Sequence, residues 1–134
     1  MLRVGSLARA IDFYTNTMGM HLIRTTENVK YEYRVAFLGY GRNPEHAEIE
    51  LTENYGVTQY DQGNAFGHIA IGVLDVYSVC DAIKAAGGFV SREPGLVKGG
   101  TSIIAFVTDP DGYKIELIQR PRIFLKADSA RHSA

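Results

Sequence analysis

The sequence lacks several features that would direct a protein to a particular environment. Its 134 residues include one cysteine, Cys80, so no internal disulfide can form. The opening MLRVGSLARA has no apolar run of the kind found in a signal peptide. We therefore expect a protein of the reducing cytoplasm, and we interpret Cys80 as a small buried hydrophobic residue rather than a nucleophile.

The chain also has no excess of either charge. Its 14 Lys and Arg nearly balance its 15 Asp and Glu, giving a net charge of -1. No basic run is present that would attract nucleic acid or a membrane surface. Because 46% of the residues are hydrophobic, the chain can bury a core as one folded unit. The expected partner is a small molecule or a second copy of the chain.

One short segment occurs twice in the chain. The residues AEIEL at 47–51 return as YKIEL at 113–117, which places Glu50 and Glu116 at equivalent positions. Isolated glutamates at the same point of a repeat predict two copies of one structural module.

The repeat extends beyond the glutamates and has a consistent offset. The segment VAFL at 35–38 returns as IAFV at 104–107, a shift of 69 positions, whereas the glutamates are 66 apart. The loop 39–48 is therefore three residues longer than its counterpart. His68 opens the second copy, and a shift of 69 places its equivalent two residues before Met1.

Each copy predicts a β-α-β-β-β order of elements. Ser6 and Asp75 are suited to cap helices that end near Gly19 and at Gly87, and β-rich segments follow each helix. We therefore predict an α+β fold of two tandem β-α-β-β-β modules, whose curved mixed sheets form a cleft. The expected parts are a first module at 1–53 with a shortened first strand, a connector at 54–67, a second module at 68–120, and a tail at 121–134 that is either a docking strand or partly disordered.

The strand pattern separates the glutamates from the core. Successive side chains of a strand point to opposite faces, so Glu50 and Glu116 face away from their aliphatic neighbours. His68 shares its face with the small residues Ala70 and Gly72. Such glutamates are often only the solvated side of an amphipathic strand. Two carboxylates and one imidazole would also suit Ni²⁺, Co²⁺ or Zn²⁺ with open positions for a substrate.

Six segments carry a resemblance to the glyoxalase I, or lactoylglutathione lyase, family of the short bacterial type. They are MLRVGSLARAIDFYTNTMGMHLIR, FLGY, IELTENYGV, GHIAIGV, REPGLVKGGT and IAFVTDPDGYKIELIQ. The similarity runs from Met1 to about Gln119. It implies a vicinal-oxygen-chelate fold and a homodimer with metal sites between subunits, each site taking two ligands from each chain.

The resemblance also implies the metal ligands. Glu50, His68 and Glu116 match three family ligands, and the fourth family ligand lies two residues before the match to Met1. We therefore expect either a gene start upstream of Met1 or a three-ligand site completed by water. The short bacterial type implies Ni²⁺ or Co²⁺ rather than Zn²⁺.

Three further residues match family positions that hold glutathione. They are Arg3, Asn54 and Lys98. Glutathione carries two carboxylates, and guanidinium, ammonium and amide groups pair well with carboxylates. Arg3 could instead be exposed on a strand end, Asn54 could form a loop turn, and Lys98 could be a solvated loop charge.

The activity implied by the resemblance is isomerisation of the methylglyoxal–glutathione hemithioacetal to S-lactoylglutathione through an enediolate. Glu116 is the expected base, and Glu50 the ligand or the base for the other epimer. Extradiol dioxygenases share the fold but use two histidines and one glutamate. A metal-free binding protein, or an inactive scaffold, is the alternative from another class. His21, His46 and His132 are expected at the surface, with His46 the one candidate for a substitute ligand.

Overall fold

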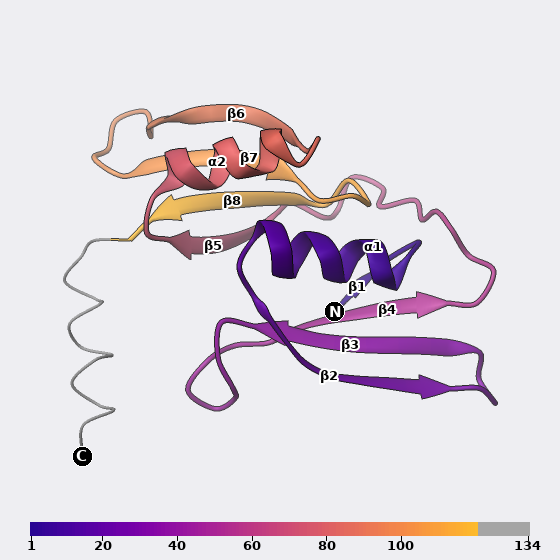
Figure 1. Ribbon diagram of the computed structural model, residues 1–134. Helices are drawn as coiled ribbons and strands as arrows, with labels where there is room; N and C mark the ends of the chain where they lie inside the picture. Colours follow the sequence, from indigo (N-terminus) through magenta and orange to yellow (C-terminus); the bar gives the residue numbers. More distant parts are fainter. Residues whose placement is uncertain (121–134) are drawn as a thin grey trace, which may run out of the picture. The chain divides into compact units, whose positions relative to one another are not determined.

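The computed structural model describes residues 1–120, and the predicted tail at 121–134 lies outside the described residues. The chain divides into two compact units (Figure 1). The first contains residues 1–67 together with the turn Asp109–Tyr113, and the second contains 68–108 and the segment that starts at Lys114. The turn therefore packs with the first unit although it joins two strands of the second.

The first unit is a four-stranded mixed sheet with a helix on one face (Figure 1). The strand order is β1-β4-β3-β2, with β1 parallel to β4 and the other pairs antiparallel. Its elements are β1 (Leu2–Arg3), α1 (Leu7–Asp12), a π-helical turn (Phe13–Thr17), β2 (His21–Asn28), β3 (Tyr33–Gly39) and β4 (Ile49–Asn54).

The second unit repeats this arrangement. Its sheet order is β5-β8-β7-β6, again with one parallel pair, β5 and β8, and two antiparallel pairs. Its elements are β5 (Ile69–Val73), α2 (Val76–Ala85), β6 (Phe89–Leu96), β7 (Ile103–Thr108) and β8 (Lys114–Gln119). The predicted α+β fold with two β-α-β-β-β modules is confirmed.

The strand register confirms that the two glutamates are equivalent. Glu50 of β4 lies opposite Phe37 of β3. Glu116 of β8 lies opposite Phe106 of β7, which is the counterpart of Phe37 in the repeat. The sequence repeat is therefore also a structural repeat, and it includes the residue paired with each glutamate on the neighbouring strand.

Both predicted helix caps are present. The Ser6 hydroxyl accepts a hydrogen bond from the Arg9 backbone N–H, and the Asp75 carboxylate accepts from the backbone N–H groups of Tyr77 and Ser78. Side-chain oxygens at this position satisfy N–H groups that have no partner within the helix. Hydrogen bonds from Ser78 hold the pKa of the Asp75 carboxyl group below its usual range. The first helix differs from expectation only in finishing with a π-helical turn.

Each helix buries one face of its own sheet. In the first unit Ala10 and Tyr14 are fully buried, as are Ala36, Leu38 and Leu51 of the sheet. In the second unit Cys80 is buried on α2, as its place on the apolar stripe predicted. Other fully buried residues of this unit are Val76, Ile83, Ala105, Val107, Ile115 and Leu117. Apolar burial is the main stabilising contribution to such a layer, at roughly 25 cal/mol per Å².

A buried polar contact fixes the β7–β8 turn in the first unit. The Tyr14 hydroxyl donates to Asp109 Oδ2 at 2.8 Å. Asp109 Oδ1 accepts from the backbone N–H groups of Asp111 and Tyr113, both at 2.9 Å. Burial raises the pKa of Asp109 and also raises the pKa of Tyr14. The carboxylate therefore depends on its three donors for stabilisation in a site with little solvent.

The substitution Tyr14→Phe tests this contact. It keeps the ring but removes one donor from a buried carboxylate, so we expect the free energy of unfolding to fall by about 1–3 kcal/mol. Urea titration measures the change, and Tyr31→Phe is the matched control because Tyr31 is exposed. A loss for Tyr14→Phe no larger than that for the control would show that the hydrogen bond contributes nothing to stability.

Candidate active site

One candidate site is the face of the first sheet that α1 does not cover. A cavity of about 440 Å³ lies over this face. It brings together three residues predicted from the sequence, Arg3, Glu50 and Asn54. Its lining, made largely of alternate residues of the four strands, is Met1, Arg3, Thr26, Tyr33, Val35, Phe37, Glu50, Thr52 and Asn54.

Glu50 lies beside the ring of Phe37, and the guanidinium group of Arg24 stacks over that ring. The guanidinium carbon of Arg24 is 3.8 Å from the centroid of the Phe37 ring, and Phe37 is opposite Glu50. Arg24 Nη1 is also 3.1 Å from Glu48 Oε2, so its charge is paired with Glu48. Glu50 has no ion pair within residues 1–120, which leaves its carboxylate available to a ligand.

Arg3 and Asn54 are placed by the β-ladder. Arg3 of β1 pairs with Thr52 of β4, and Asn54 is two residues further along the same strand. Asn54 Nδ2 donates to the Tyr60 hydroxyl at 2.9 Å, which fixes the orientation of the amide. Guanidinium and amide groups on one sheet face can bind a carboxylate.

Thr52 is a site residue that the sequence analysis missed. Its Oγ1 is buried, and no hydrogen-bond partner is found for it in the described part of the chain. A buried hydroxyl without a partner is unfavourable by about 1–3 kcal/mol. The signal that could have identified it is the alternation Glu50, Thr52, Asn54, which places all three side chains on one face.

Another candidate site is in the second unit, where His68 and Glu116 meet. His68 Nε2 is 3.0 Å from Glu116 Oε2. The side chains are 39% and 19% exposed, so the pair is accessible but partly shielded. The ring of Phe106 meets the imidazole edge to face at 5.2 Å between centroids, and it lies opposite Glu116 in the sheet.

The chemistry of these side chains fits a divalent metal. An imidazole nitrogen and a carboxylate oxygen that converge on one point are typical ligands of Zn²⁺, Ni²⁺ and Co²⁺. Of the predicted set, the structure brings His68 and Glu116 together, while Glu50 belongs to the other unit. Within residues 1–120 no group of three or more His, Cys, Asp or Glu side chains gathers. The complete ligand set remains a prediction.

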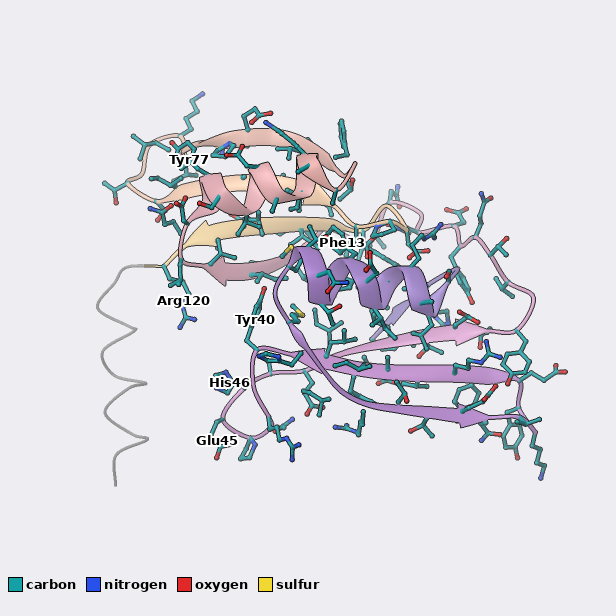
Figure 2. The ribbon with its side chains drawn as sticks, viewed as in Figure 1. Phe13, Tyr40, Glu45, His46, Tyr77 and Arg120 are labelled. Carbon is teal, nitrogen blue, oxygen red and sulfur yellow. The ribbon has the colours of Figure 1, made fainter. Side chains whose placement is uncertain are left out.

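The other candidate residues lie apart from these contacts. Lys98 is exposed in the loop between β6 and β7. Arg92 donates to the backbone carbonyl groups of Ile104 and Leu96, at 2.7 and 2.9 Å, and so closes the irregular β6–β7 pairing. His21 is exposed at the start of β2, and His46 is exposed on the loop after β3 (Figure 2). His132 lies outside the described residues.

The sequence and fold match one large superfamily. Residues 1–117 match the family described as the glyoxalase/bleomycin resistance protein/dioxygenase superfamily. The chain belongs to this superfamily, and the fold agrees with that membership.

More similar relatives narrow the comparison to glyoxalase I. A protein of Vibrio cholerae named "Probable lactoylglutathione lyase" is 66% identical over 119 residues, which cover 89% of this chain and 86% of the relative. Trypanothione-dependent glyoxalase I from Leishmania major has a TM-score of 0.80 at 40% identity, over 97% of this chain and 91% of that one. Glyoxalase I from Zea mays has a TM-score of 0.85 at 51% identity over 89% of this chain. The match spans 43% of the maize chain.

The resemblance to glyoxalase I is therefore confirmed over most of the chain. No helix in the described residues is both long and apolar enough to cross a membrane.

The substitution Thr52→Val tests the unpaired hydroxyl. Valine keeps the branched shape and removes the buried polar atom, so we expect the free energy of unfolding without ligand to stay level or rise by about 1 kcal/mol. Thermal and urea unfolding of the ligand-free protein measure the change. A loss of more than about 1 kcal/mol would mean that the hydroxyl already has a partner.

Proposed function

We propose that this protein is a glutathione-dependent lactoylglutathione lyase, which isomerises the methylglyoxal–glutathione hemithioacetal to S-lactoylglutathione. The observation that carries the proposal is the convergence of His68 and Glu116, with Nε2 and Oε2 3.0 Å apart, in a chain 66% identical to a relative of that name. The reaction moves a proton from one carbon to its neighbour. It therefore needs a base that can return the proton it takes.

Glu116 is suited to that task. Its Oε2 is held by His68, and no partner of Oε1 is found in the described chain, so Oε1 is the oxygen that can take the proton. Because one carboxylate can reach both adjacent carbons, the same oxygen can return the proton after the enediolate has formed. Glu50, at the equivalent point of the first sheet, would bind as a ligand or serve the other substrate epimer.

His68 and Glu116, with Glu50, would hold a divalent metal. When bound, the metal would act as a Lewis acid on the two adjacent oxygens of the substrate and so favour loss of the proton. We propose Ni²⁺ or Co²⁺ in preference to Zn²⁺. The support for this choice is the similarity to short bacterial relatives, since the ligand types alone suit all three ions.

The cavity over the first sheet would bind the peptide part of glutathione. Glu50, Thr52 and Asn54 follow one another along β4 on one face, with Arg3 beside Thr52. This row leads from the reacting group to cationic and amide groups that suit a carboxylate. Lys98, exposed on its loop, would approach the other carboxylate of the tripeptide.

We further propose that the protein is a cytoplasmic homodimer with its active sites between subunits. A site shared by two chains would take Glu50 from one chain and the His68–Glu116 pair from the other. The single buried cysteine supports a reducing compartment.

The substitution Glu116→Gln tests the base. Glutamine keeps the size of the side chain but is not basic, so we expect kcat to fall at least about 100-fold while the fold is retained. Initial rates with the hemithioacetal and a thermal unfolding curve measure the two properties. Glu93→Gln is the matched control, because Glu93 is an exposed glutamate of the same unit, paired with Lys84. Turnover near the control value would exclude Glu116 as an essential base.

Removal and return of metal test the cofactor. We expect the protein to lose lyase activity after dialysis against EDTA and to regain more with Ni²⁺ or Co²⁺ than with Zn²⁺. Elemental analysis of the dialysed and reconstituted samples gives the stoichiometry. Absence of lyase activity with all three ions would refute the proposed function, and equal recovery with Zn²⁺ would refute only the choice of metal.

A further inference from the structure

The imidazole of His68 is in contact with an aromatic ring as well as with a carboxylate. The His68 and Phe106 rings meet at 80°, close to perpendicular, with 5.2 Å between their centroids. This is the edge-to-face arrangement, which aromatic pairs prefer and which adds to the stabilisation gained from burial. A perpendicular contact limits how far either ring can turn, so Phe106 constrains the orientation of the imidazole.

The strand register explains why these two rings meet. Ala70 of β5 pairs with Glu116 of β8, which in turn pairs with Phe106 of β7. The three side chains therefore lie in one row across the sheet. His68 comes two residues before Ala70 and shares its face. Because the alanine side chain is small, it leaves room for the imidazole to reach the carboxylate and the phenyl ring.

The phenyl ring has a second attractive contact. Lys114 precedes Glu116 by two residues on β8, and its Nζ lies 5.4 Å from the centroid of the Phe106 ring. A cation within about 6 Å of an aromatic centroid is attracted to the ring. Phe106 therefore has favourable contacts with both a cation and an imidazole, which together restrict its movement.

The contact with Phe106 becomes more important when a metal is bound. An ionised carboxylate only accepts hydrogen bonds, so His68 Nε2 donates in the 3.0 Å contact with Glu116 Oε2. A nitrogen that binds a metal has no proton, so this hydrogen bond is not available in the metal-bound protein. A metal-binding histidine is usually oriented by a hydrogen bond from its other ring nitrogen. No partner of His68 Nδ1 is found within residues 1–120, whereas the Phe106 ring contacts the same imidazole.

We propose that Phe106 is a positioning residue, whose ring holds the His68 imidazole in the orientation that metal binding requires. This inference rests on the proposed function of His68 as a metal ligand and deepens it. The phenyl ring takes the place of the hydrogen bond that orients other metal-binding histidines through their second ring nitrogen. Phe106 acts through His68 and takes no part in the proton transfer.

Nickel affinity tests the inference. In Phe106→Leu the side chain stays apolar but loses its ring, so we expect the Kd for Ni²⁺ to rise about three- to tenfold, as for the loss of one edge-to-face contact. Phe106→Tyr keeps the ring and should bind Ni²⁺ within about twofold of the wild type. Isothermal titration calorimetry on each protein measures Kd. The matched control is Phe89→Leu, which makes the same change at an exposed phenylalanine of the same unit and should leave Kd unchanged.

Motion of the imidazole is a second readout that needs no metal. Carbon-13 relaxation of the ring C–H groups measures how freely each histidine ring moves. The measurement is made on Glu116→Ala, which removes the hydrogen bond to His68 and leaves the ring contact. We expect the His68 ring to be more ordered than that of exposed His21, and to become as mobile as His21 when Phe106→Leu is added.

The two measurements can each contradict the inference. It is overturned if Phe106→Leu binds Ni²⁺ as tightly as the wild type, if Phe106→Tyr binds as weakly as Phe106→Leu, or if Phe89→Leu weakens binding as much. It is also overturned if the His68 ring is as mobile as that of His21 while Phe106 is still in place. A residue that only contacts the substrate would change KM of the hemithioacetal and leave both readouts at their wild-type values.

Failure of the proposed metal site gives a different result. A wild type that binds none of Ni²⁺, Co²⁺ and Zn²⁺ would refute His68 as a metal ligand. The relaxation measurement on the metal-free protein would still decide whether Phe106 holds the imidazole.

Discussion

The rule that successive side chains of a strand point to opposite faces determines where chemistry can occur in this protein. Each sheet has one face covered by its helix, where residues such as Leu51 and Leu117 are fully buried. The glutamates that precede them in sequence must therefore lie on the other face. In the strand register, the two glutamates pair with equivalent phenylalanines, Phe37 and Phe106. The positions of Glu50 and Glu116 thus follow from the hydrophobic burial of the opposite face of each sheet.

The β7–β8 turn supports β1, the strand that carries Arg3. β1 comprises only Leu2 and Arg3, so its ladder pairing with β4 is short. The Tyr113 hydroxyl donates to the Arg3 backbone carbonyl at 2.7 Å, and Asp111 accepts from the Gly5 N–H. These contacts hold β1 at its carboxyl end. The buried hydrogen bond between Tyr14 and Asp109 fixes the β7–β8 turn itself. Residues near the end of the chain therefore help to position Arg3 near its beginning.

Much of the fold and part of the site could be predicted from the sequence because they depend on local pattern. Helix caps at Ser6 and Asp75, the order of elements along the chain and the outward glutamates each follow from spacing or residue type. The roles of Thr52 and Asp111 could not be predicted, because each depends on which donors reach a buried oxygen in the folded chain. The π-helical turn at Phe13–Thr17 was missed for a similar reason, since apolar spacing does not distinguish it from an α-helical turn.

The two copies share a backbone but differ in the side chains beside their glutamates. In the first unit, Arg3, Thr52 and Asn54 form a polar row along the site. The positions equivalent to these three in the repeat are Gly72, Ile118 and Arg120. A Cβ atom at Gly72 would lie 2.7 Å from Cδ of Arg120, so this glycine lets the arginine side chain lie against the strand.

The second unit therefore has no equivalent of the polar row, but it has the imidazole that holds its glutamate. The two sheets therefore offer a ligand different groups: the first a row of polar side chains, and the second a carboxylate held by an imidazole.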